Sequence, residues 1–136
     1  MNNFYDYIDG VKVPLIGDTR ERVEQLMGKP IYCDQGTVSY KGLKVHYHEG
    51  VFSTTVEAID FFNEELKVFG EKLFGLTFDD VIELFKSKLT SSLYLREESD
   101  VNSQVLIPDY YLELEFEDNC FYSFSIQDKK YFKLRK

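Results

Sequence analysis

The segment LELEFED, near the C-terminal end of the sequence, has the side-chain pattern with the clearest chemical meaning. Glu113, Glu115 and Glu117 alternate with apolar residues, and Asp118 follows them. Because successive side chains of a strand point to opposite faces, the glutamates are expected on one face, about 7 Å apart. With Tyr111 among the nearby tyrosines, this row of carboxylates is suited to contacts with lysine and arginine side chains. The same pattern also fits a strand face that is only solvated.

Two histidines, His46 and His48, occupy alternate positions of a second strand-like segment. Their imidazoles should point to the same side and could form half of a metal site, with Glu49 or Asp60 as a further ligand. No spacing identifies the remaining ligands, so a solvent-facing pair on a sheet is the preferred interpretation. We expect neither a metal nor a cofactor.

Motifs for catalysis are absent from the sequence. It has no G-x-S-x-G elbow and no glycine-rich phosphate loop, and neither cysteine lies in a motif that places a histidine beside it. The neighbouring carboxylates Asp79 and Asp80 stand at a predicted helix start, where they interact favourably with the helix dipole. The sequence therefore predicts a protein that is not an enzyme.

The charge of the chain restricts the classes of partner. Its 136 residues include 24 acidic and 16 basic ones, for a net charge of −8. Such a field repels nucleic acid and attracts a basic protein surface. Five of the basic residues lie in the C-terminal segment KKYFKLRK. This segment is predicted to be an edge strand whose lysines block unwanted pairing, or alternatively a contact for an acidic patch.

Targeting signals also bear on the partner. No apolar run reaches the roughly 20 residues that cross a bilayer, and the first residues do not form a secretory signal. We therefore expect no membrane contact and a cytoplasmic location. In that compartment Cys33 and Cys120 should be reduced, and we expect both to be buried packing residues.

Two phrases of the sequence, GDTRERVEQLM and GLTFDDVIELF, are similar to each other. Gly17 aligns with Gly75, and Thr19 aligns with Thr77. Each phrase has the spacing of a helix start, with a capping residue followed by an apolar helical face. In the second phrase Thr77 is the expected cap, whereas in the first Thr19 competes with the aspartate before it.

After each predicted helix the apolar period changes from that of a helix to that of a strand. In the first half, Leu43, Val45 and Tyr47 alternate with polar residues, and Glu49-Gly50 forms a turn. In the second half, LELEFED leads to a turn at Asp118-Asn119 and a return strand.

Further strands and loops complete the expected organisation. A short third strand is expected at residues 66–69 and another at residues 131–134, and residues 96–104 are expected to form a mobile loop. The opening segment FYDYIDGVKV is expected to form a hairpin about Asp9-Gly10 or a strand added to a sheet edge.

These patterns predict one domain of the α+β class over residues 1–136. It should consist of two tandem pseudo-symmetric helix–three-strand repeats, at about 15–70 and 73–135, that form antiparallel sheet packed by helices. Neither half alone would bury enough apolar surface to be stable, so the halves should share a core or a sheet.

The phrase GDTRERVEQLMGKP resembles the G-x-T-x-x-x-V-x-x-L-x-G-x-P opening of helix–sheet modules in SmpA/OmlA-type outer-membrane assembly lipoproteins. The tandem organisation is similar to that of the β-lactamase inhibitor protein. This resemblance, over about 14 residues per copy, implies a helix docked on a sheet and the binding of another protein by a sheet surface. The sequence differs from those families because it has no export signal or lipid-attachment cysteine.

In its size, its acidity and its lack of a catalytic set, the chain also resembles immunity proteins of polymorphic and contact-dependent inhibition toxins. The resemblance implies a cognate basic toxin domain, typically a nuclease, as the partner. Neutralisation would be steric and electrostatic, and we expect the partner-binding residues to be Glu113, Glu115, Glu117, Asp118 and Tyr111. A non-catalytic scaffold module and a small-molecule sensor with its site between the repeats are the alternatives. The sequence predicts no oligomeric state.

Overall fold

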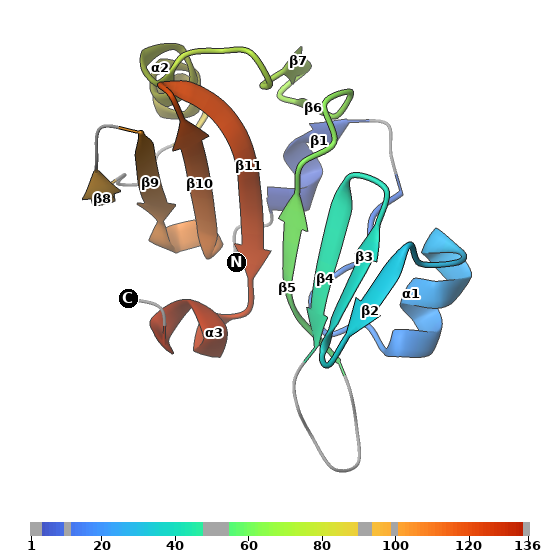
Figure 1. Ribbon diagram of the computed structural model, residues 1–136. Coiled ribbons are helices and arrows are strands. Elements are labelled where there is room, and N and C mark those ends of the chain that lie inside the picture. Colours follow the sequence, from blue (N-terminus) through green and yellow to red (C-terminus); the bar gives the residue numbers. More distant parts are fainter. Residues whose placement is uncertain (1–3, 10–11, 48–54, 90–93, 99–100, 135–136) are drawn as a thin grey trace. The chain divides into compact units, whose positions relative to one another are not determined.

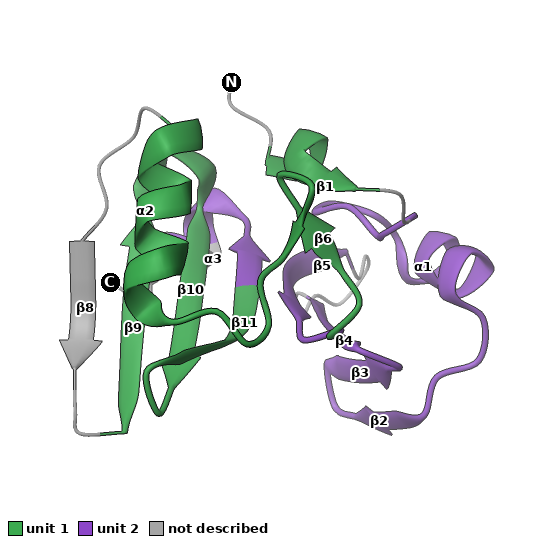
Figure 2. Ribbon diagram, turned by 90° about the horizontal axis from the view of Figure 1, so that it is seen from above, with its two compact units in different colours: residues 1–11, 64–124 green, residues 12–63, 125–136 purple. Residues whose placement is uncertain are grey.

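The structure is a computed structural model that describes residues 4–9, 12–47, 55–89, 94–98 and 101–134 (Figure 1). The chain forms two compact units, and each is built from two separate segments (Figure 2). Unit 1 contains residues 1–11 and 64–124, and unit 2 contains residues 12–63 and 125–136. Helices combined with antiparallel strands give the α+β class that the sequence predicts.

Unit 1 combines helix α2 with two groups of strands. Its helices are η1 (Phe4–Tyr7), α2 (Phe78–Lys88) and η2 (Pro108–Tyr110). Its strands are β1 (Ile8–Asp9), β6 (Lys67–Val68), β7 (Glu71–Lys72), β8 (Tyr94–Glu98), β9 (Asn102–Ile107), β10 (Leu112–Glu117) and the first five residues of β11 (Cys120–Gln127). The strands are ordered β1-β6-β7 in one group and β11-β10-β9-β8 in the other.

Helix α2 begins where the second phrase predicts. Gly75 has φ +91°, a conformation that glycine adopts without steric cost, and it leads the chain to the cap residue Thr77. The Thr77 side chain accepts a hydrogen bond from the backbone N–H of Asp80 at 3.3 Å. The N–H of Phe121 donates to the carbonyl of Leu76 at 2.9 Å, so the helix start is held against the beginning of β11.

An aromatic cluster fills the interior of unit 1. Phe85, from α2, stacks on Phe4 with ring centroids 5.9 Å apart and meets Phe69 edge-on at 5.1 Å. Phe124 from β11 and Tyr110 from η2 contact Phe4 with ring centroids 5.7 and 6.1 Å apart. Phe4, Phe85 and Phe124 are at most 2% exposed, so the N-terminal segment supplies a ring to the centre of this core.

Unit 2 places helix α1 beside a second run of strands. Its helices are α1 (Arg20–Met27) and α3 (Lys129–Leu134). Its strands are β2 (Tyr32–Asp34), β3 (Thr37–Tyr40), β4 (Leu43–Tyr47), β5 (Val56–Phe61) and the last three residues of β11. Their order is β2-β3-β4-β5-β11.

Helix α1 begins in the same way as α2. Gly17 also has φ +91°, and Thr19 is the cap residue, with its side chain accepting from the N–H of Arg22 at 3.2 Å. The N–H of Val56 donates to the carbonyl of Asp18 at 2.9 Å and so ties this start to β5. Of the two possible caps in the first phrase, the threonine is therefore the one that is used.

The alternation predicted for β4 is confirmed. Leu43, Val45 and Tyr47 are buried, whereas Lys44 between them is exposed. The Arg20 guanidinium lies over the Tyr47 ring, 4.4 Å from its centroid. Burial raises the pKa of the Tyr47 hydroxyl to about 12. The predicted Glu49-Gly50 turn lies outside the described residues.

Two expectations about secondary structure are wrong. The C-terminal segment expected as an edge strand forms helix α3, in which the N–H of Phe132 donates to the carbonyl of Asp128 at 3.0 Å. The segment 96–104, expected as a mobile loop, instead supplies residues to strands β8 and β9. In this part of β9, Asn102 and Gln104 stand opposite the glutamates of β10, whereas Ser103 stands opposite Phe116.

Strands β1 and β6 also have partners that the sequence does not predict. The strand expected at residues 66–69 is the two-residue β6, which pairs with β1 and β7 rather than with β5. The opening segment contributes β1, so the alternative of a strand added to a sheet edge is confirmed. Residue Gly10, in the alternative hairpin turn, lies outside the described residues.

The similarity of the two phrases is clear at the helix starts. Thr19 forms an isolated antiparallel bridge with Thr55, and Thr77 forms one with Cys120, so each cap lies beside the residue that precedes or begins a return strand. The compact units, however, each join two separate segments of the chain. The larger tandem repeat over residues 15–70 and 73–135 stays a prediction.

Candidate partner-binding site

Strand β10 carries apolar and acidic side chains on opposite faces, as its alternation predicts. Leu112, Leu114 and Phe116 are at most 1% exposed and belong to the core face. Phe116 contacts the ring of Phe78 from α2 at 4.8 Å, so this face is the one that the helix covers. The glutamates therefore occupy the other face of the strand.

The glutamates differ strongly in exposure, which corrects one expectation. Glu113 is only 1% exposed, Glu115 is half-buried and Glu117 is exposed. In the antiparallel register, Glu113 stands opposite Leu106 of β9, which is also buried, with only 4% of its surface exposed. Glu113 was expected to meet a partner from the solvent, and its burial excludes that contact in this conformation.

Glu115 is held in place by side chains from both neighbouring strands. The Ser123 hydroxyl, on β11, donates to Glu115 Oε2 at 2.8 Å. The Gln104 amide, on β9, lies 3.4 Å from Oε1. These contacts fix the direction of the carboxylate before any partner arrives, which lowers the entropy cost of binding to it.

Tyr122 joins the glutamates because the alternation of β11 is interrupted. Phe121 and Phe124 are three positions apart, yet their rings contact each other on the core side. Ser123 lies on the glutamate side, where it bonds to Glu115. Tyr122, which is 48% exposed, also lines the surface beside Glu115 and Glu117.

Together these side chains line a groove of about 410 Å³, which we call the acidic groove. Its lining residues are Val101, Asn102, Ser103, Gln104, Glu115, Phe116, Glu117 and Tyr122. It combines carboxylates, side-chain amides and one half-exposed aromatic ring. Such a lining is suited to a cationic side chain whose stem is apolar.

Besides the buried Glu113, two more of the expected site residues lie outside the acidic groove. Asp118 is exposed in the turn after β10, with φ +51°, and its N–H donates to the carbonyl of Val101 at 2.7 Å. Tyr111 precedes β10, at the opposite end of that strand from Glu117. At about 3.3 Å per residue, the six residues of β10 separate Tyr111 from this end by about 20 Å. Tyr122, and not Tyr111, is therefore the tyrosine that lines the acidic groove.

Sequence reasoning missed the contribution of β9 to the groove. Asn102 and Gln104 stand directly opposite Glu117 and Glu115. Their segment was expected to be a loop, although the polar–apolar change from Gln104 to Val105 marks the middle of the strand. A short polar strand is recognisable only once its cross-strand partner is known, because polar residues are not typical of strands.

In unit 2, His46 forms a row of polar side chains together with Thr37 and Asp60. Its Nε2 lies 2.7 Å from Asp60 Oδ2, and its Nδ1 lies 3.1 Å from Thr37 Oγ1. A carboxylate accepts hydrogen bonds, so the proton of a neutral imidazole is on Nε2 and Nδ1 accepts from the threonine hydroxyl. The row orders the ring across three neighbouring strands. His48 and Glu49, the other expected members of a metal site, lie outside the described residues.

The described residues give further information on metals, thiols and membranes. Among them no group of three or more His, Cys, Asp or Glu side chains could hold a metal ion. Cys33 and Cys120 are free thiols and both are exposed, so the expectation that they are buried is wrong. Every helix in the described part of the chain is too short or too polar to span a lipid bilayer.

The chain was compared with protein families, with curated proteins and with solved structures, and no match was found in any of the three comparisons. The geometry of the acidic groove is therefore the basis on which a function can be argued.

Proposed function

We propose that the protein is a non-catalytic, protein-binding inhibitor whose acidic groove receives a basic side chain of its partner. More specifically, we propose that it is an immunity protein of the cytoplasm, and that the partner is a basic toxin domain, such as a nuclease. The observation that carries the proposal is the combination of oriented Glu115, exposed Glu117 and half-exposed Tyr122 in one groove.

The chemistry of the acidic groove favours a cationic occupant. Two carboxylates on one strand face give a local negative potential, and the net charge of −8 adds a longer-range attraction for a basic surface. The Tyr122 ring can cover the apolar stem of an arginine or lysine. Attraction of this kind increases the rate of encounter and selects among partners.

Inhibition would follow from occupancy alone. A basic toxin domain whose cationic side chains are held in the groove cannot present them to an anionic substrate, and the body of the inhibitor blocks approach. This mechanism needs no reaction on the inhibitor itself. The free, exposed thiols Cys33 and Cys120 are compatible with a reducing compartment, which supports the cytoplasmic location.

The test is co-expression with a candidate toxin domain, which the proposal expects to be the C-terminal domain of a large protein encoded beside this gene. We expect that domain to stop growth and the intact chain to restore it. Glu117→Lys should weaken complex formation about 10- to 100-fold, since it places like charges against the partner. Affinity of the unaltered complex should fall as ionic strength rises.

A matched control separates the groove from total charge. Glu83→Lys changes the net charge by the same amount on the exposed side of α2, outside the groove, and should retain rescue. Tyr122→Ala should weaken the complex without changing charge. Equal rescue by Glu117→Lys, Tyr122→Ala and the unaltered chain would remove the groove from the mechanism. A complex without any toxicity of the neighbouring domain would instead favour a scaffold role.

A further inference from the structure

We infer that unit 2 carries a second docking groove, which receives a segment of a partner protein that has acidic residues next to branched aliphatic ones. This groove has a volume of about 370 Å³ and lies between residues 12–18 and helix α1. Its lining includes Lys12, Val13, Leu15, Asp18, Arg22 and Leu26. We call it the basic groove, and it goes beyond the acidic groove of the proposed function in both position and chemistry.

Hydrogen bonds hold the walls of the basic groove in place. The Leu15 N–H donates to Asp18 Oδ2 at 2.9 Å, and the Asp18 N–H donates back to the Leu15 carbonyl at 3.0 Å. The Gly17 N–H donates to the carbonyl of Val56 at 2.9 Å, which fastens this turn to β5. The other wall is α1, whose start is capped by Thr19. A groove formed in this way exists before a ligand binds.

Part of the lining of the basic groove is apolar. Leu15 is 45% exposed and is one of five exposed large hydrophobic residues in the described part of the chain. Val13 and Leu26, which line the groove beside it, are only half-buried. A branched aliphatic side chain placed here would remove apolar surface of both partners from water.

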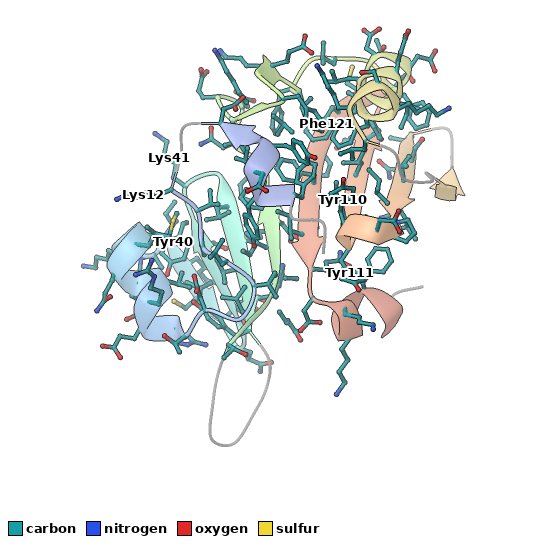
Figure 3. All side chains as sticks on the ribbon, turned by 180° about the vertical axis from the view of Figure 1, so that it is seen from behind. Lys12, Tyr40, Lys41, Tyr110, Tyr111 and Phe121 are labelled. Atoms are coloured by element: carbon teal, nitrogen blue, oxygen red, sulfur yellow. The ribbon has the colours of Figure 1, made fainter. Side chains whose placement is uncertain are left out.

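The rim of the groove is positively charged. Lys12 and Arg22 are both exposed, and the Lys12 side chain points away from the ribbon (Figure 3). The carboxylate in the lining, Asp18, already accepts from the Leu15 backbone. Arginine binds carboxylates through two parallel hydrogen bonds, which makes Asp or Glu the complementary residue on the partner. In a chain of net charge −8, this groove therefore selects the opposite charge from the acidic groove.

The presence of apolar and cationic side chains in one groove favours a peptide as the occupant, because a peptide can carry aliphatic and acidic side chains in one short segment. Aliphatic residues of such a segment can enter the groove while its acidic residues contact the exposed Lys12 and Arg22 at the rim. The occupant we assign is accordingly a partner segment in which Leu or Ile alternates with Asp or Glu.

The experiment uses the full ¹⁵N-labelled chain and the probe acetyl-Glu-Leu-Asp-Leu-amide. We expect the probe to shift backbone amide signals of residues 12–26. The comparison peptides acetyl-Gln-Leu-Asn-Leu-amide and acetyl-Glu-Ser-Asp-Ser-amide, which lack the charge or the aliphatic groups, should bind about tenfold more weakly or not at all. Decanoate serves as a lipid-like competitor.

Variants locate the binding within the basic groove. Arg22→Glu and Leu15→Ser should each weaken the probe about tenfold, and both residues are exposed, so the variants should fold. Lys86→Glu, the same kind of charge reversal on exposed α2 of unit 1, should bind the probe as the unaltered chain does. Unchanged melting temperatures confirm that the variants are folded.

Three results would overturn the inference. These are equal binding of the uncharged peptide, unchanged binding by the folded Arg22→Glu variant, and signal shifts confined to residues outside the groove. Tighter binding of decanoate than of the peptide would assign the groove to a lipid-like anion in place of a protein segment. None of these results depends on the Glu117→Lys and Tyr122→Ala variants, so the two proposals fail separately.

Discussion

Helices α1 and α2 start alike, yet they bury very different side chains. Both follow a glycine at φ +91°, and the cap residues Thr19 and Thr77 have nearly the same backbone conformation, with ψ of 160° and 164°. Helix α2 buries Val81 and Phe85, whereas α1 buries Val23. The shared glycine and threonine thus fix where each helix begins, and the apolar residues that follow determine how much of each helix is buried in the core.

The difference has consequences for the surface of each unit. In unit 1, Phe85 enters an aromatic cluster that uses the apolar face of α2. In unit 2, the shorter α1 leaves Leu26 half-buried and Leu15 exposed. These side chains form apolar surface that lines the basic groove. Strong burial of the helix favours stability, and incomplete burial leaves a place for a partner.

The largest effect is expected from truncation of the two helix anchors. Phe85→Ala should lower the free energy of unfolding by about 3 to 5 kcal/mol, because it removes a fully buried ring and leaves a cavity. Val23→Ala removes far less volume and should cost about 1 to 2 kcal/mol. Urea unfolding measures both. Phe85→Leu, which keeps much of the volume, should cost no more than about 1.5 kcal/mol and serves if Phe85→Ala does not fold. Equal losses for Phe85→Ala and Val23→Ala would remove the contrast between the helices.

Alkaline pH should lower the stability of the protein through the buried hydroxyl of Tyr47 in unit 2. Burial raises the pKa of this hydroxyl from 10 to about 12. Between these two values the folded state keeps a proton that the unfolded chain releases. The contribution of Tyr47 to the free energy of unfolding is therefore fully present below pH 10 and declines as pH rises toward 12. At the upper end the loss should approach about 2 to 3 kcal/mol.

Tyr47→Phe tests this origin, because it removes the ionisable group and keeps the ring beside Arg20. The free energy of unfolding, measured in urea from pH 9 upward, should fall less steeply with pH for this variant than for the unaltered chain. Tyr122→Phe, in which the ring is 48% exposed, is the matched control and should follow the unaltered chain. The assignment is wrong if the two variants have the same pH dependence.

The glycines before the two helices should be equally sensitive to substitution. Gly17→Ala and Gly75→Ala each force a Cβ into a conformation with φ +91°, although neither position has another heavy atom within 4 Å of that Cβ. Backbone strain alone should cost about 1 to 2 kcal/mol at either site. Thermal unfolding of both variants measures this cost. Unequal losses would show that the two starts are less alike than their backbone angles indicate.

The smallest effects are expected from removal of the caps. Thr19→Ala and Thr77→Ala each remove one hydrogen bond from a side chain to a helix N–H, and each should cost about 1 kcal/mol. Thr→Ser at the same positions keeps the hydroxyl and should restore most of the stability. The comparison of the helices would be sharpened if Thr19→Ala has the larger effect, since α1 has fewer buried anchors to hold its first turn.

Those features of the fold that rest on local signals could be predicted from the sequence. The helix starts depend on Thr19 and Thr77 with their glycines, and the β10–β11 turn depends on Asp118 and Asn119, which have φ of +51° and +62°. The alternation of LELEFED placed Glu115 and Glu117 on one face, and both line the acidic groove. Periodicity gives the face of a strand directly, because it is a property of consecutive residues.

Features that depend on neighbours distant in sequence could not be predicted. Alternation assigns Glu113 to the same face as Glu117, but its burial depends on surroundings that include Leu106 on the adjacent strand. The polar half of β9 is a strand because β10 and β8 pair with it on its two sides. In the C-terminal segment, a run of six residues such as KKYFKL fits either a strand or a helix, and α3 is the outcome.

The interleaving of the two units along the chain determines when each can be completed during synthesis. Phe4 leaves the ribosome before most of the rings that surround it, which come from residues 69–124, so unit 1 lacks most of its central contacts until that later stretch has emerged. Residues 12–63 likewise wait for the end of β11. No continuous fragment contains all of unit 1 and excludes unit 2, and a nascent chain that stops before residue 120 has neither unit whole.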